Sequence, residues 1–139
     1  MFKTVLVATS ILCTFPSLTE NGYIEFEKKD DSVTYIHPKA AYPFPDLNRV
    51  GIVEYKIFNK RQSSRAGNFQ SILSTKLCDC KNRAVQTVRI SVYDYIYPTG
   101  PLVFERDFKD HELKWEPLVK GSHGEALCKI ACSILTHHQ

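Results

Sequence analysis

Four cysteines occur in two closely spaced pairs, and such pairs can form disulfides, bind zinc or act as a redox dithiol. Cys78 and Cys80 are separated by one residue, whereas Cys128 and Cys132 are separated by three. In a strand, residues i and i+2 point to the same face with Cα atoms about 6.5–7 Å apart. In a helix, residues i and i+4 share a face and lie about 6 Å apart along the axis. Two side-by-side disulfides between a strand and a helix would therefore fit this spacing.

Other uses of these cysteines fit the spacing less well. A four-cysteine zinc site usually has at least two residues between ligands on a tight turn, and Cys78 and Cys80 have one. A catalytic dithiol normally has the form C-x-x-C at a helix start, whereas Cys128 and Cys132 lie well inside an expected helix. Free buried thiols are the third alternative. We expect two disulfides, each worth about 2–4 kcal/mol, although the closed loops overlap and the contributions would not add fully.

The N-terminal residues have the pattern of a short secretory signal. Lys3 is followed by an apolar run over residues 5–12, and no acidic residue occurs before Glu20. The run is too short to span a bilayer as a helix, and a buried N-terminal strand or helix is the alternative. We expect residues 1–19 to be a signal peptide and residues 20–139 to form one domain of an exported protein, since disulfides persist outside the cytosol.

The fifth cysteine, Cys13, lies within the expected signal peptide. Removal of residues 1–19 would leave an even set of four cysteines. Leu12 stands where a lipoprotein signal requires a small residue, so the sequence does not favour lipid attachment at Cys13. We expect contact with a membrane only if Cys13 is lipidated.

The middle of the chain is rich in β-forming residues and in turn signals. Six segments are expected to be strands: 22–29, 32–38, 49–59, 69–80, 83–95 and 102–108. The first two form a hairpin, and the fourth and fifth are adjacent antiparallel strands. The apolar residues of the third segment do not keep one alternation, so we expect a bulge near Val53–Glu54. Residues 39–48 and 60–68 are expected to be loops.

The last segment has a helical pattern. Ser122 and Glu125 have the spacing of a capping box. The apolar residues that recur at helical period are Leu127, Ile130, Ala131, Ile134 and Leu135. We therefore expect one amphipathic helix over residues 123–137. Strands followed by a single terminal helix indicate an α+β domain, in which an antiparallel sheet of about six strands packs against the C-terminal helix and is disulfide-linked to it.

Composition and motifs argue against several functional classes. The formal net charge is only +3, and no basic block alternates with stacking aromatic residues, so we expect no nucleic-acid binding. The sequence contains no G-x-S-x-G, no H-E-x-x-H and no phosphate-binding glycine loop, so we expect a protein that is not an enzyme and needs no cofactor. The histidines show no metal-ligand spacing, and His123 is expected simply to begin the helix.

Two stretches of the second half share motifs with a known family. KLCDCKNRAVQTVRISVYDYIYPTG begins at Lys76 and contains "DC" at the end of an expected strand, a basic strand that runs to "YD", and a glycine turn. KWEPLVKGSHGEALCKIAC begins at Lys114 and contains W-x-x-L, a "GS" helix start and a terminal "AC". These motifs resemble the surface-adhesin protein E family of Gram-negative bacteria. The resemblance covers about residues 22–135.

The resemblance implies a sheet whose C-terminal helix is joined to it by one disulfide, which corresponds here to Cys80–Cys132. Cys78 and Cys128 exceed the family's usual single pair, and we expect them to form the second bridge. The resemblance also implies a location in the cell envelope, in the periplasm or on the outer-membrane surface. For the founding member it implies dimerisation and adhesion to host matrix proteins such as vitronectin and laminin.

The resemblance implies that basic residues around the "DC" strand carry the matrix binding of the family. The corresponding cations here are Lys60, Arg61, Arg65, Lys76, Lys81, Arg83 and Arg89. Our first hypothesis is a non-catalytic, exported envelope protein that resembles a surface adhesin and binds host or envelope macromolecules through these cations. The alternative is a periplasmic structural or stress-related protein that uses the same scaffold without adhesive activity.

Overall fold

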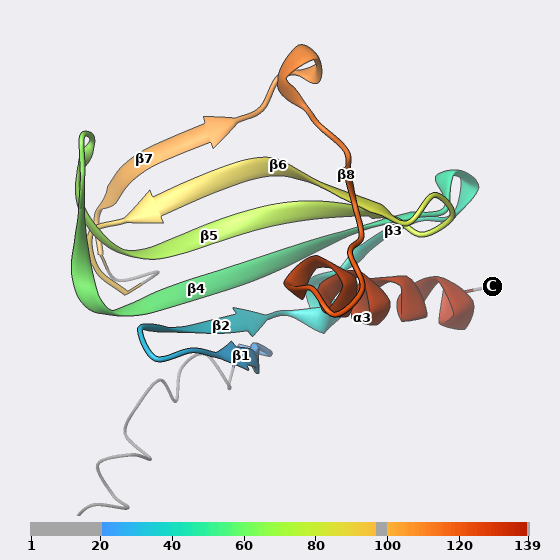
Figure 1. Cartoon of the computed structure of the whole chain (residues 1–139), viewed down its shortest axis with the longest axis horizontal. Helices are drawn as coiled ribbons and strands as arrows, with labels where there is room; N and C mark the ends of the chain where they lie inside the picture. Colours follow the sequence, from blue (N-terminus) through green and yellow to red (C-terminus); the bar gives the residue numbers. More distant parts are fainter. Residues whose placement is uncertain (1–20, 97–99, 139) are drawn as a thin grey trace, which may run out of the picture.

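One antiparallel sheet and one α-helix make up most of the computed structural model, which describes residues 21–96 and 100–138. The strands are β1 (Ile24–Lys28), β2 (Ser32–Ile36), β3 (Tyr42–Phe44), β4 (Arg49–Ser64), β5 (Gly67–Asp79), β6 (Ala84–Tyr93), β7 (Leu102–Asp107) and β8 (Glu116–Pro117). Their order is β1-β2-β4-β5-β6-β7, with β3 paired to β4 and β8 paired to β6. The C-terminal helix α3 (His123–His138) packs on one face of the sheet (Figure 1). The predicted α+β fold is confirmed.

Both segments that were expected to be loops contain regular structure. Residues 39–48 include β3 and most of two short 3₁₀ helices, Pro38–Ala40 and Pro45–Leu47. Pro43 is tolerated in β3 because this short strand pairs with β4 alone and needs no second set of backbone hydrogen bonds. A third 3₁₀ helix, Asp110–Glu112, follows β7. Among the described residues, no helix has the length and apolar character needed to cross a membrane.

Residues 60–68 extend β4 and β5 into a long hairpin instead of forming a loop. β4 has 16 residues and β5 has 13, so β5 spans about 40 Å at about 3.3 Å per residue. Gly67 pairs with Ser64 at the end of the hairpin and has a φ of 133°, which favours glycine. The strands contain polar residues here because hydrogen bonding between the two backbones, rather than burial of side chains, stabilises the hairpin end.

The predicted bulge in β4 is wrong in its position. The register between β4 and β5 is unbroken from Arg49 to Ile57, and the shift lies between Ile57 and Gln62. Glu54 therefore keeps its place in the alternation, directly opposite Ser74.

The apolar pattern of β4 changes because the strand is buried on both faces. Val50 and Ile52 pack in the core beneath α3, whereas Tyr55 and Ile57 belong to a second cluster. Since successive side chains in a strand point to opposite faces, the second cluster lies on the face away from the helix. The partly buried residues that complete it are Tyr23, Tyr35, Leu73 and Ile96.

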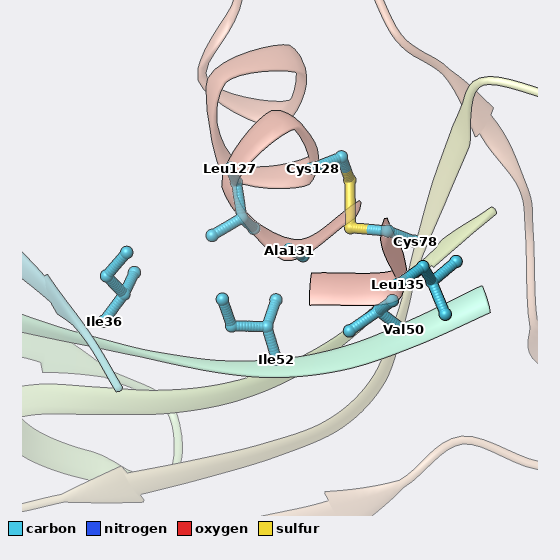
Figure 2. Packing of buried hydrophobic residues seen from close by; sticks show 8 residues of the cluster. All are labelled: Ile36, Val50, Ile52, Cys78, Leu127, Cys128, Ala131 and Leu135. Atoms are coloured by element: carbon cyan, nitrogen blue, oxygen red, sulfur yellow. A yellow bond between two sulfur atoms is a disulfide. The ribbon is translucent and has the colours of Figure 1, made fainter. Parts of the chain in front are cut away.

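The main core lies between α3 and the sheet (Figure 2). Its buried residues are Ile36, Val50, Ile52, Cys78, Leu127, Cys128, Ala131 and Leu135. Leu127, Ala131 and Leu135 follow the predicted helical period, and each is at most 5% exposed. The Ser122 hydroxyl accepts a hydrogen bond from the Glu125 N–H, so the predicted helix start is confirmed. The Glu125 carboxylate accepts a hydrogen bond from the Gly121 N–H and not from the Ser122 N–H that a capping box would use.

Two disulfides join α3 to the end of β5. They link Cys78 to Cys128 and Cys80 to Cys132, with Cα atoms 5.6 and 5.8 Å apart. The Cys80–Cys132 bridge agrees with the one that the family resemblance implied, and Cys78–Cys128 is the expected second bridge. The Cys78–Cys128 bridge lies inside the core, whereas Cys80 and Cys132 are partly exposed. The expected signal peptide, including Cys13, lies outside the described residues.

Candidate functional site

The cations that were expected to bind a ligand are spread over both ends of the molecule. Arg61 and Arg65 lie at the β4–β5 hairpin end. Lys81 and Arg83 lie in the turn between β5 and β6, at the other end of β5. Because β5 separates the two groups by about 40 Å, these residues do not form one continuous basic face.

Most of these cations are already paired with carboxylates. The ion pairs are Arg61–Asp94, Lys76–Glu54 (3.6 Å), Arg83–Glu125 (3.0 Å), Arg89–Glu105 (2.6 Å) and Arg89–Asp107 (3.2 Å). Within the described part of the chain, Lys60, Arg65 and Lys81 have no ion pair. Of the seven predicted cations, these three are therefore the most available to an acidic partner, and a ligand-binding role for the whole set remains a prediction.

A histidine held between two carboxylates lies where α3 meets the sheet. His123 Nε2 is 2.6 Å from Glu54 Oε2 on β4, and its Nδ1 is 3.2 Å from Glu27 Oε1 on β1. Lys76 on β5 lies 3.6 Å from the second oxygen of Glu54 and donates a hydrogen bond to Thr87 on β6. We call His123, Glu54, Glu27 and Lys76 the His123 cluster. It connects the first turn of the helix to β1 and to the centre of the sheet.

The two central members of the His123 cluster stabilise each other's charged form. Burial alone would raise the pKa of Glu54, but the hydrogen bond with His123 and the positive charge of Lys76 outweigh burial and hold this pKa below its usual range. The hydrogen bond with Glu54 raises the pKa of His123, against the opposing effect of partial burial, and Glu27 adds to the rise. In the charged state both ring nitrogens donate hydrogen bonds, one to each carboxylate.

A cavity of about 250 Å³ opens beside the His123 cluster. Its lining residues are Glu27, Lys29, Thr34, Glu54, Lys56, Ile72, Ser74 and His123. Charges of both signs line it, and no group of three or more His, Cys, Asp or Glu side chains in the described residues is arranged to hold a metal ion. The hydrogen bonds and the ion pair of the His123 cluster attach the helix to the sheet. The residues that line the cavity do not indicate a reaction.

Two features of the sequence correspond to members of this cluster, but no sequence pattern relates one feature to the other. His123 directly follows the helix cap, and Glu54 interrupts an apolar strand at a position that points toward the helix. Each feature has an ordinary explanation by itself. Only the packing of α3 across β4 brings their side chains, 69 residues apart, into contact.

An apolar groove of about 310 Å³ lies between the hairpin end and the start of β7. Its lining residues are Ser64, Arg65, Ala66, Phe69, Val92, Val103 and Phe104. Gly67 lies beside this groove, and a Cβ there would be in ordinary van der Waals contact with a Val103 methyl carbon 3.4 Å away, so it is the φ of 133° that favours glycine. No sequence pattern predicted the groove, because its lining comes from four separate segments of the chain.

Comparisons with known proteins agree with this architecture. The family model for surface-adhesin protein E matches residues 23–133. A solved structure of Haemophilus influenzae protein E superposes with a TM-score of 0.62 at 18% sequence identity, covering 84% of this chain and 87% of the other. A second crystal form of that protein gives a TM-score of 0.61 at 18% identity and covers 83% and 90% of the two chains. No curated protein matches the chain by sequence. At this identity the solved structures show a shared fold.

Proposed function

Because this chain belongs to the surface-adhesin protein E family, we propose that it is an exported, non-catalytic protein of the cell envelope that binds macromolecules through its exposed surface. The family match over residues 23–133 is the observation that carries this proposal. Host matrix proteins such as vitronectin and laminin are the partners that the family resemblance implies.

Export is supported by two features of the chain. Lys3 and the apolar run over residues 5–12 have the pattern of a secretory signal, which we propose to be removed as residues 1–19 and to leave one domain over residues 20–139. Two disulfides in a small domain also suit an oxidising compartment outside the cytosol.

The end of the β4–β5 hairpin is the surface that we propose for binding. Lys60, Arg61 and Arg65 are exposed there, and Asp94 neutralises only Arg61. Loop and hairpin ends that a rigid scaffold holds away from the core are common recognition elements. An acidic segment of a matrix protein would approach this end without displacing a core residue.

Charge reversal at the hairpin end is expected to weaken matrix binding. The double substitution Lys60→Glu and Arg65→Glu should reduce the affinity for purified vitronectin or laminin by roughly tenfold at low ionic strength, and by less as salt screens the charges. Biolayer interferometry at several salt concentrations measures this change. The matched control is Lys120→Glu with Lys129→Glu, because both lysines are exposed, lie away from the hairpin end and do not belong to the predicted binding set. Equal loss in both variants would contradict a specific role for the hairpin end.

The export proposal predicts the mass and the accessibility of the mature protein. Intact mass without reduction should show loss of residues 1–19, no lipid, and the loss of four hydrogen atoms that corresponds to two disulfides. Protease added to intact cells should cleave a surface-exposed protein. If cleavage requires a permeabilised outer membrane, the protein is periplasmic, and the alternative of a structural or stress-related role replaces adhesion.

A further inference from the structure

The outer edge of β7 is available for pairing. β7 ends the sheet order and pairs with β6 on its inner side, and no other described strand pairs with its outer side (Figure 1). Unpaired edges attract other strands, and proteins usually protect them with charged residues, bulges or very short strands. The edge strand at the other side of the sheet, β1, has five residues and a register irregularity.

The two halves of β7 differ in how well they are protected. Glu105 and Asp107 place charges in the second half, where both pair with Arg89 on β6. The first half instead presents Leu102 and Phe104, which are 51% and 42% exposed. An exposed apolar segment at a free strand edge is a typical docking position for an extended peptide.

The apolar groove continues directly from this half of β7. Val103 and Phe104 belong both to the edge strand and to the groove lining, and Phe69 and Val92 extend the lining inward. A strand added to the β7 edge would place every second side chain on the same face, so one of them can enter the groove. Backbone pairing and a side-chain pocket therefore occur side by side, which is the arrangement that strand addition uses.

Arg65 defines the charge of the occupant. It lines the groove at the hairpin end and has no ion pair within the described residues. Its guanidinium is therefore able to bind a carboxylate of the occupant through two hydrogen bonds. An acidic residue two positions from the one in the groove would lie on the same face, about 6.5–7 Å away.

We propose that the outer edge of β7 and the adjoining groove bind an extended peptide segment of a partner protein as an added strand. An apolar side chain of the segment occupies the groove, and an acidic side chain two positions away pairs with Arg65. This inference rests on the proposed function as a binding protein and assigns a surface and a chemical class of partner to it.

A designed peptide tests the proposal. The probe is a short peptide of alternating valine and threonine that carries one phenylalanine and, two positions later, one glutamate. Its binding to the mature protein is measured by fluorescence anisotropy. Replacing the glutamate of the peptide with lysine, or inserting a proline beside the phenylalanine, should each weaken binding by about tenfold or more. Hydrogen exchange should show slower exchange of β7 amides in the complex.

Substitutions in the protein provide the matched comparison. Phe104→Ser and Arg65→Glu should each weaken peptide binding by about tenfold, whereas Phe44→Ser should not change it. Phe44 is a suitable control because it is 41% exposed and lies in β3, far from β7 in the sheet order. Unchanged binding in Phe104→Ser would overturn the proposal.

Two further outcomes separate this inference from the proposed function. If vitronectin or laminin binds and no designed peptide does, the strand-addition surface is wrong and the adhesive function stands. If peptides bind at β7 and neither matrix protein binds, the inference stands and those host partners are wrong. If Phe104→Ser instead converts a dimer into a monomer in analytical ultracentrifugation, a second copy of this chain occupies the edge and the proposal is overturned.

Discussion

Replacing all four bridged cysteines with alanine is expected to lower the free energy of unfolding by about 5–6 kcal/mol, whereas removing either disulfide alone should cost about 2 kcal/mol. The bridges span 50 and 52 residues of sequence, and each closes nearly the same loop. While one bridge remains, the long loop stays closed, and the missing bridge restrained only the few residues between the two. Loss of both opens the whole loop in the unfolded chain, so the two single costs should sum to less than the combined cost. Urea unfolding monitored by circular dichroism measures all three values.

The two variants that each lack one disulfide serve as controls for each other. Their loop lengths are almost equal, so a difference between them reports the environment of the sulfur atoms. Cys78 and Cys128 are at most 1% exposed within the core, and their replacement also leaves a small cavity there. The Cys78→Ala/Cys128→Ala variant should therefore be less stable than the Cys80→Ala/Cys132→Ala variant. The reverse order, or single costs that add up to the combined cost, would contradict a jointly closed loop.

Replacing His123 with glutamine is expected to lower the free energy of unfolding by about 1–2 kcal/mol near pH 6, because Glu54 loses a charge-assisted hydrogen bond while Lys76 still compensates part of its charge. The raised pKa of His123 means that its contribution is complete below about pH 6.5 and is lost as the pH rises through the folded-state value. The lowered pKa of Glu54 means that its contribution is complete above about pH 4.5 and is lost as the pH falls through its folded-state value. The cluster should therefore stabilise the fold most between about pH 4.5 and 6.5.

Thermal unfolding from about pH 4.5 to 8 measures the effect. The parent protein should lose stability from pH 6.5 to 8 by more than the His123→Gln variant does, so the two curves should converge at high pH. His111→Gln is the control, because His111 is exposed on the 3₁₀ helix after β7 and should leave the curve unchanged. Parallel curves for the parent and His123→Gln would show that His123 does not titrate in the contact with Glu54.

Several elements could be predicted because their information is local. The β-forming residues of β5 and β6 indicate strands, the apolar period of α3 records which side of the helix is buried, and both patterns correspond to elements in the structure. β4 shows where this approach fails. Its change of alternation at Val53–Glu54 suggested an irregular strand, yet it arises because Tyr55 and Ile57 pack on one face while Val50 and Ile52 pack on the other. A pattern along one strand cannot distinguish a bulge from burial on both faces.

The sequence by itself determined the elements that carry the cysteines and, through its motifs, the family. Spacing of two along a strand and of four along a helix places each pair of sulfur atoms on one face, and that relation holds whatever surrounds the element. Only the tertiary structure decided which charged side chains meet. The same cations that suggested one basic face are separated by the length of β5, and most are neutralised by carboxylates from other elements of the fold. The contact of His123 with Glu54, and the groove that Arg65 and Phe104 both line, depend on how the helix and the hairpin end pack across the sheet. That packing results from burial summed over many residues, so no local pattern contains it.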